Sequence, residues 1–140
     1  MGKRPKYKHQ PFESGTEQGK FTKVCDDMMD SPAWAALSLR QQGLYLALKR
    51  KYTQKVSGGI LISDNADNIS LPKSEALTMY GTLRSFRVDI DKLIACGFIR
   101  LIQSGFNTRT VNIYGFSDRW KRYGQTDFEV PAYEQRRATR

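Results

Sequence analysis

The sequence predicts an α+β fold in which two helices joined by a tight turn precede a β-hairpin. Helices are expected over residues 73–80 and 83–96, the second capped by Thr82, with Gly81 in the turn because glycine tolerates a positive φ angle. Two β-branched, apolar segments at residues 98–103 and 110–116 predict the strands of the hairpin. This order of elements is the layout of a winged helix-turn-helix.

The residues before this motif predict a helical extension. Ser31 and Ser38 are expected to cap two helices, the second of which covers residues 39–52 with apolar side chains at helical spacing. Residues 53–67 are rich in Gly, Ser, Asn and Asp and predict a loop that could hold a short strand. Residues 68–71 are expected to form the first strand of the winged-helix sheet.

Composition divides the chain into three parts. Residues 1–20 form a basic tail, residues 21–124 the winged-helix domain, and residues 125–140 a second basic tail. Both tails contain few apolar residues and are expected to be flexible. The first could lie along DNA phosphates or be a solvated tail without a partner.

Net charge favours a polyanionic partner. The chain carries 23 Lys and Arg against 14 Asp and Glu, a net charge of +9. Nucleic acid is the first expectation and an anionic membrane the second, while a basic protein without such a partner is the alternative. No apolar run has the length of a membrane span or resembles a signal peptide, so we expect a cytoplasmic protein that does not contact a membrane.

The chemistry-bearing residues do not suggest an enzyme. His9 is the only histidine and lies in the first tail, so neither a Ser-His nor a Cys-His pair is expected. Cys25 and Cys96 have no further Cys or His at a metal-binding spacing. The three aspartates within residues 26–30 are explained by the preference of acidic side chains for helix starts. We therefore expect no catalysis, no cofactor and no metal ion.

The helix over residues 83–96 separates an apolar face from a polar one. Its core face is predicted to hold Leu83, Phe86, Ile90, Leu93 and Ile94. In the first half of the opposite face, the side chains are short or basic and can form hydrogen bonds. A helix that reads bases in the major groove requires such side chains. The predicted base-reading residues are Arg84, Ser85, Arg87 and Val88. The alternative is that the two arginines are ordinary solvated positions.

A further set of residues is predicted to contact the DNA backbone. Thr82 lies at the start of the helix, where free N–H groups bind phosphate, and Lys92 lies farther along it. The loop between the two strands is the predicted wing, in which Asn107 and Arg109 can donate hydrogen bonds. The complete set of predicted backbone contacts is Thr82, Lys73, Lys92, Asn107, Arg109, Lys49 and Lys121.

Some of these residues have a second interpretation. Lys49 belongs to a basic cluster at a helix C-terminus, where cations are favourable without any ligand. Lys121 belongs to a basic and aromatic cluster at residues 119–123, which could flank DNA or cover the core. Asp89 and Asp91 would repel phosphate, and we expect them to pair with cations of the same helix instead.

Short motifs accompany the helix-turn-helix: DSPAW at residues 30–34, LIACGFI at residues 93–99 and SDRW at residues 117–120. With these motifs, residues 21–124 resemble small winged-helix DNA-binding proteins of bacterial mobile elements, namely plasmids, phages and integrative conjugative elements. They are also similar to N-terminal domains of replication initiators of such elements. The resemblance implies sequence-specific binding to double-stranded DNA in control of transcription, replication or conjugative transfer.

Two other functions remain open on the sequence alone. Winged helices also dock on proteins, in which case Phe106 and the cluster at residues 119–123 would form the contact. A non-specific accessory DNA-binding protein is the third reading. Further partners considered are a second copy of the chain, since one helix and one wing cover few base pairs, and replication or transfer proteins.

Overall fold

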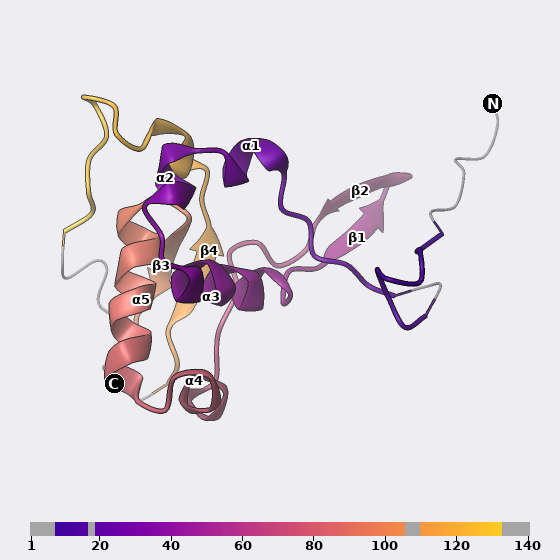
Figure 1. Ribbon diagram of the computed structural model, residues 1–140, viewed down its shortest axis with the longest axis horizontal. Coiled ribbons are helices and arrows are strands. Elements are labelled where there is room, and N and C mark those ends of the chain that lie inside the picture. The colour runs from indigo at the N-terminus through magenta and orange to yellow at the C-terminus, as the bar shows by residue number, and fades with distance from the viewer. Residues whose placement is uncertain (1–7, 17–18, 106–109, 133–140) are drawn as a thin grey trace.

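A computed structural model describes residues 8–16, 19–105 and 110–132. Within these ranges the chain forms five α-helices, one short 3-10 helix and two antiparallel sheets of two strands each (Figure 1). The predicted α+β class is therefore confirmed.

The second and third helices begin at the predicted caps, Ser31 and Ser38, and a short helix precedes them. The three helices are α1 (Asp26–Met29), α2 (Pro32–Ala35) and α3 (Leu39–Lys49). The Ser31 hydroxyl accepts a hydrogen bond from a backbone N–H of α2, and Ser38 forms a capping box at the start of α3. Helix α3 ends at Lys49, earlier than the sequence predicted.

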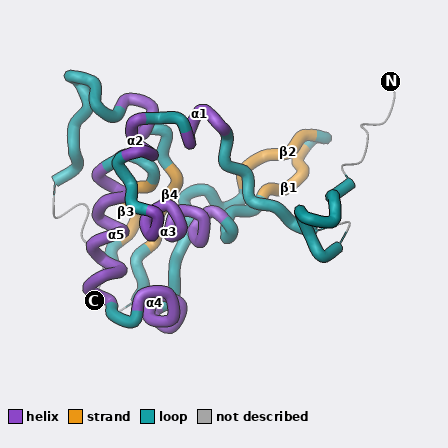
Figure 2. The backbone as a smooth tube through the Cα atoms, viewed as in Figure 1, coloured by secondary structure: helices purple, strands orange, loops and turns teal. Residues whose placement is uncertain are grey.

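The glycine-rich segment after α3 is a hairpin. The short strand that the predicted loop could hold is present as its second strand, whereas the loop prediction is wrong for the first strand. Strand β1 (Gln54–Ser57) pairs with β2 (Ile60–Ser63) in an antiparallel register. Gly58 and Gly59 connect them with φ angles of +59° and +80°, as a tight two-residue hairpin turn requires. This hairpin projects away from the rest of the molecule (Figures 1 and 2).

The two predicted central helices are present. They are α4 (Lys73–Tyr80) and α5 (Leu83–Ala95), and Gly81 between them has a φ angle of +75°. Thr82 caps α5 by accepting a hydrogen bond from the N–H of Ser85. Helix α5 packs against α3, α4 and the following strand, so it forms the centre of the fold.

Strands β3 (Ile99–Gln103) and β4 (Ile113–Phe116) form the second antiparallel hairpin. The predicted first strand at residues 68–71 is reduced to one bridge, in which Ile69 and Tyr114 exchange two backbone hydrogen bonds of 2.9 and 2.7 Å. Pro72 follows closely and lacks an N–H group, so the segment has little length in which to continue the pairing.

The 3-10 helix η1 (Arg119–Arg122) closes the fold at the C-terminal end of α5. The N–H of Trp120 donates to the carbonyl of Gly97 over 3.0 Å. Gly97 has a φ angle of +88°, and a Cβ atom there would come within 2.6 Å of the Trp120 nitrogen. Glycine is therefore required at this position both by its conformation and by the close approach of η1.

Aromatic rings fill the space between α2, α3 and η1. The fully buried Phe98 ring lies 5.8 Å from Trp34, 5.5 Å from Tyr45 and 6.2 Å from Trp120, measured between centroids. Trp120 is thus a core residue, and the half-buried Trp34 packs against the core. The predicted core face of α5 is also buried at Phe86, Ile90, Leu93 and Ile94, while Leu83 is half-buried against the core.

Candidate nucleic-acid interface

Helix α5 presents the predicted polar face to solvent. Arg84 is exposed and Val88 is 57% exposed, whereas Phe86 on the other side is buried. Ser85 and Arg87 are half-buried at the two borders. The four predicted base-reading residues therefore all lie at accessible positions in the first two turns of α5.

The cap at the start of α5 organises two hydroxyl groups. The Thr82 oxygen accepts from the backbone N–H of Ser85 over 3.3 Å, and its hydroxyl donates to the Ser85 oxygen over 3.1 Å. In this arrangement the Ser85 hydroxyl can still donate its own hydrogen. A hydroxyl donor and the N–H groups of a helix start are suited to bind a phosphate oxygen.

Asp89 does not face the polar side of α5. Its carboxylate is 1% exposed and accepts hydrogen bonds from Nε of Arg40 over 2.7 Å and from Nε2 of Gln41 over 3.1 Å. Burial favours the neutral acid, but these hydrogen bonds outweigh it and hold the pKa of Asp89 below its usual value. The expected pairing of Asp89 within its own helix is wrong: α3 neutralises this charge, away from the exposed face.

Arg87 lies on the border of α5 that is close to β4. Burial raises the pKa of Tyr114 to about 12, and the hydrogen bond from Asn112 and the positive charge of Arg87 oppose part of this rise. Arg87 is half-buried and within electrostatic reach of Tyr114, while Arg84 is exposed to solvent.

The loop after β3 is closed at its neck by polar contacts. Asn112 is 3% exposed, accepts from the N–H of Gly105 over 3.0 Å and donates to the Tyr114 hydroxyl over 3.2 Å. The N–H of Thr110 donates to the carbonyl of Gly105 over 3.1 Å. These bonds explain why β4 begins at residue 113 rather than at 110: the preceding residues hold the neck of the loop.

A narrow crevice joins this neck to the starts of α4 and α5. Lys73, Leu83 and Asn112 line it together. Lys73 therefore lies at the same end of the molecule as the predicted base-reading residues. The tip of the loop, which carries the predicted contacts Asn107 and Arg109, lies outside the described residues.

Lys92 lies farther along α5 and is half-buried. It follows Arg84 by two helical turns, about 12 Å along the axis at 1.5 Å per residue. Its ammonium group is thus separated from the base-reading residues and is suited to a contact with the DNA backbone.

Comparisons with protein-family models, with curated protein sequences and with solved structures find no match to this chain. The described ranges contain no cluster of three or more His, Cys, Asp or Glu side chains that could hold a metal ion. Within the same ranges, no helix is long and apolar enough to cross a membrane.

Two predicted backbone contacts lie away from the start of α5. The Lys49 ammonium is 4.5 Å from the Tyr52 ring centroid and 5.0 Å from that of Phe116. Lys121 belongs to η1, which packs at the opposite end of α5 from Arg84. Both lysines line a separate hollow beside the end of α3.

The sequence did not reveal the residues that hold α5 and the neck of the loop in place. Arg40 and Gln41 hold Asp89, and Asn112 holds the neck of the loop. Arg40 and Asp89 are far apart in the sequence, so no local spacing relates them. The apolar residues on either side of Asp89 were the available signal, since a carboxylate beside the core face of a helix requires a partner.

Proposed function

We propose that this chain is a winged-helix protein that binds double-stranded DNA sequence-specifically, with α5 as the recognition helix. The order of α3, α4, α5 and the β3–β4 hairpin supports this fold, and the bridge at Ile69 stands where a winged helix has its first strand. In this assignment Gly81 forms the turn of the helix-turn-helix, and the loop between β3 and β4 is the wing.

The observation that carries the proposal is the composition of the start of α5. Arg84 and Val88 are exposed on one face, and Ser85 and Arg87 border it. Arginine pairs bidentately with guanine, serine hydrogen-bonds to bases or phosphates, and a valine methyl can contact a thymine methyl. A closed wing neck and Lys73 lie beside this face and provide positions for backbone contacts.

The proposal includes a role on a bacterial mobile element. This part follows from the resemblance of residues 21–124 to winged-helix proteins of plasmids, phages and integrative conjugative elements. DNA binding there would control transcription, replication or conjugative transfer of the element. The net charge of +9 suits this partner, because lysine and arginine release counterions from the DNA backbone.

Docking on a protein is less well supported, because the cluster around η1 contacts the chain itself. The Arg119 guanidinium donates to the carbonyl of Glu129 and lies 5.1 Å from the Phe128 ring centroid. Arg122 forms an ion pair with Asp127. These contacts leave the start of α5 as the more open polar surface.

Replacing Arg84 with alanine tests the assignment of α5. We expect the affinity for the preferred duplex to fall by about 1–3 kcal/mol, with relaxed preference at the base pair that Arg84 reads. The matched control is Arg100→Ala. It removes one exposed arginine of β3, whose guanidinium forms an ion pair with Asp67 over 2.7 Å. Fluorescence anisotropy against a set of duplexes measures both effects. Equal loss in the two variants for every duplex would refute the assignment.

A further inference from the structure

A second basic surface lies beside the end of α3. It is a hollow of about 950 Å³ between the segment before α1, the C-terminal end of α3 and η1. Five cations line it, and they come from these three segments: Lys20, Lys23, Lys49, Arg50 and Lys121. Asp27 is the one acidic residue that lines it. The hollow therefore carries a net positive charge.

Several basic residues outside the hollow are neutralised by carboxylates. In the described part of the chain, Lys51, Lys55 and Arg100 form ion pairs with Glu75, Asp64 and Asp67, at 2.9, 3.6 and 2.7 Å. None of the five cations of the hollow forms an ion pair with a described residue.

Two lysines of the hollow contact aromatic rings and form no ion pair with a described carboxylate. The ammonium of Lys49 faces the rings of Tyr52 and Phe116, and that of Lys121 is 5.7 Å from the Trp120 ring centroid. A cation–π contact leaves the positive charge unneutralised. The positive potential of the hollow thus remains available to an external anion.

The helix dipole does not account for the whole cluster. Lys49 and Arg50 lie at the C-terminal end of α3, where cations are favourable without a ligand. Lys20, Lys23 and Lys121 belong to other segments. The ammonium of Lys20 donates to the carbonyl of Arg50, the C-cap residue of that helix, over 3.4 Å. Lys23 and Lys121 have no such bond to it among the described residues. Their convergence on one hollow is a property of the tertiary fold.

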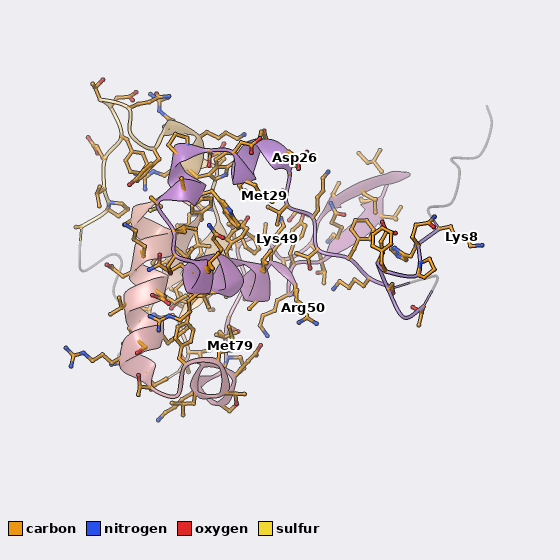
Figure 3. The ribbon with its side chains drawn as sticks, viewed as in Figure 1. Lys8, Asp26, Met29, Lys49, Arg50 and Met79 are labelled. Carbon is orange, nitrogen blue, oxygen red and sulfur yellow. The ribbon has the colours of Figure 1, made fainter. Side chains whose placement is uncertain are left out.

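The hollow is separated from the start of α5. Arg40, near the beginning of α3, contacts Asp89 of α5. Lys49 and Arg50 follow nine and ten residues later, about 14 Å along α3. Figure 3 labels both at the end of α3 that is farther from α5. The hollow thus lies at the far end of α3 and beside η1, on a different part of the molecule from the start of α5.

We propose that this hollow is a second nucleic-acid surface, which binds the phosphate backbone of a segment other than the one at α5. The cations would neutralise phosphates without reading bases, so binding here is independent of sequence and weakens as salt rises. A protein with both surfaces can bring two DNA segments together. The hollow does not require α5 to bind DNA, so the two proposals can fail separately.

The test is the number of short random-sequence duplexes bound per chain at low salt, measured by sedimentation. The hollow variant combines Lys23→Gln, Arg50→Gln and Lys121→Gln, all at exposed positions. The control variant combines Lys55→Gln, Arg100→Gln and Arg122→Gln, which are also exposed but form ion pairs. Each variant removes three positive charges. Circular dichroism checks that both are folded.

We expect two duplexes per chain for the wild type and the control variant, and one for the hollow variant. If α5 does not bind DNA, the wild type binds one duplex and the hollow variant none, which still supports this surface. Equal numbers for the hollow variant and the wild type would overturn the proposal. A second result would also overturn it: the hollow variant binds as many duplexes as the wild type but no longer binds anionic lipid vesicles. The ligand of the hollow would then be a membrane and not a nucleic acid.

Discussion

Replacing Phe98 with alanine is expected to lower the free energy of unfolding by about 3–5 kcal/mol. The Phe98 side chain is fully buried, and its ring contacts Trp34 and Tyr45 edge-on or tilted and is stacked on Trp120. Alanine would leave a cavity between α2, α3 and η1 that these large rings cannot readily fill. Urea unfolding followed by tryptophan fluorescence measures the loss, because two of the contacting residues are tryptophans.

The matched control for this variant is Phe12→Ala, at a side chain that is 87% exposed. Removing an exposed ring should change the free energy of unfolding by less than about 0.5 kcal/mol. A similar loss in both variants would contradict the placement of Phe98 at the centre of the core.

Replacing Asp89 with asparagine is expected to lower the free energy of unfolding by about 1–3 kcal/mol at neutral pH. The change keeps the size of the side chain but removes the charge that accepts hydrogen bonds from Arg40 and Gln41. These bonds tie α5 to α3, so the variant should also weaken binding of the preferred duplex. Asp118→Asn, at an exposed carboxylate, is the control.

The difference in the free energy of unfolding between wild type and Asp89→Asn should depend on pH in a defined direction. The pKa of Asp89 is lowered by folding, so its ionised form favours the folded chain. This contribution is complete above the pKa of an unfolded aspartate, about 3.9, and is lost as the pH falls from there through the lower folded-state value. The gap between wild type and Asp89→Asn should therefore be constant near neutral pH and narrow below about pH 4. A gap that widened on acidification would contradict this network.

Local signals in the sequence predicted most of the helices. Ser31, Ser38 and Thr82 cap the helices they were expected to cap, and Gly81 and Gly97 follow α4 and α5 with positive φ angles. Each of these features depends on a few neighbouring residues, which is why sequence alone could identify them. The amphipathic pattern of α5 likewise predicted which of its faces is buried.

Features that depend on tertiary contacts were not predictable in this way. The β1–β2 hairpin was predicted as a loop that could hold one short strand, because its turn is formed by two glycines and its short strands are largely exposed. Asp89 was assigned to partners within its own helix, whereas its partners lie on α3. Lys49 and Lys121 were grouped with the α5 site, but the fold places them in the separate hollow.

The most direct test of the central claim is selection of bound sequences from a random duplex library at near-physiological salt. We expect an enriched motif that wild type and Arg100→Ala share, and that Arg84→Ala loses at one or more positions. Specific binding should also retain a preference for that motif as salt rises, whereas non-specific binding to the backbone fades. Retention of all sequences alike, with binding that disappears as salt rises, would contradict sequence-specific recognition by α5.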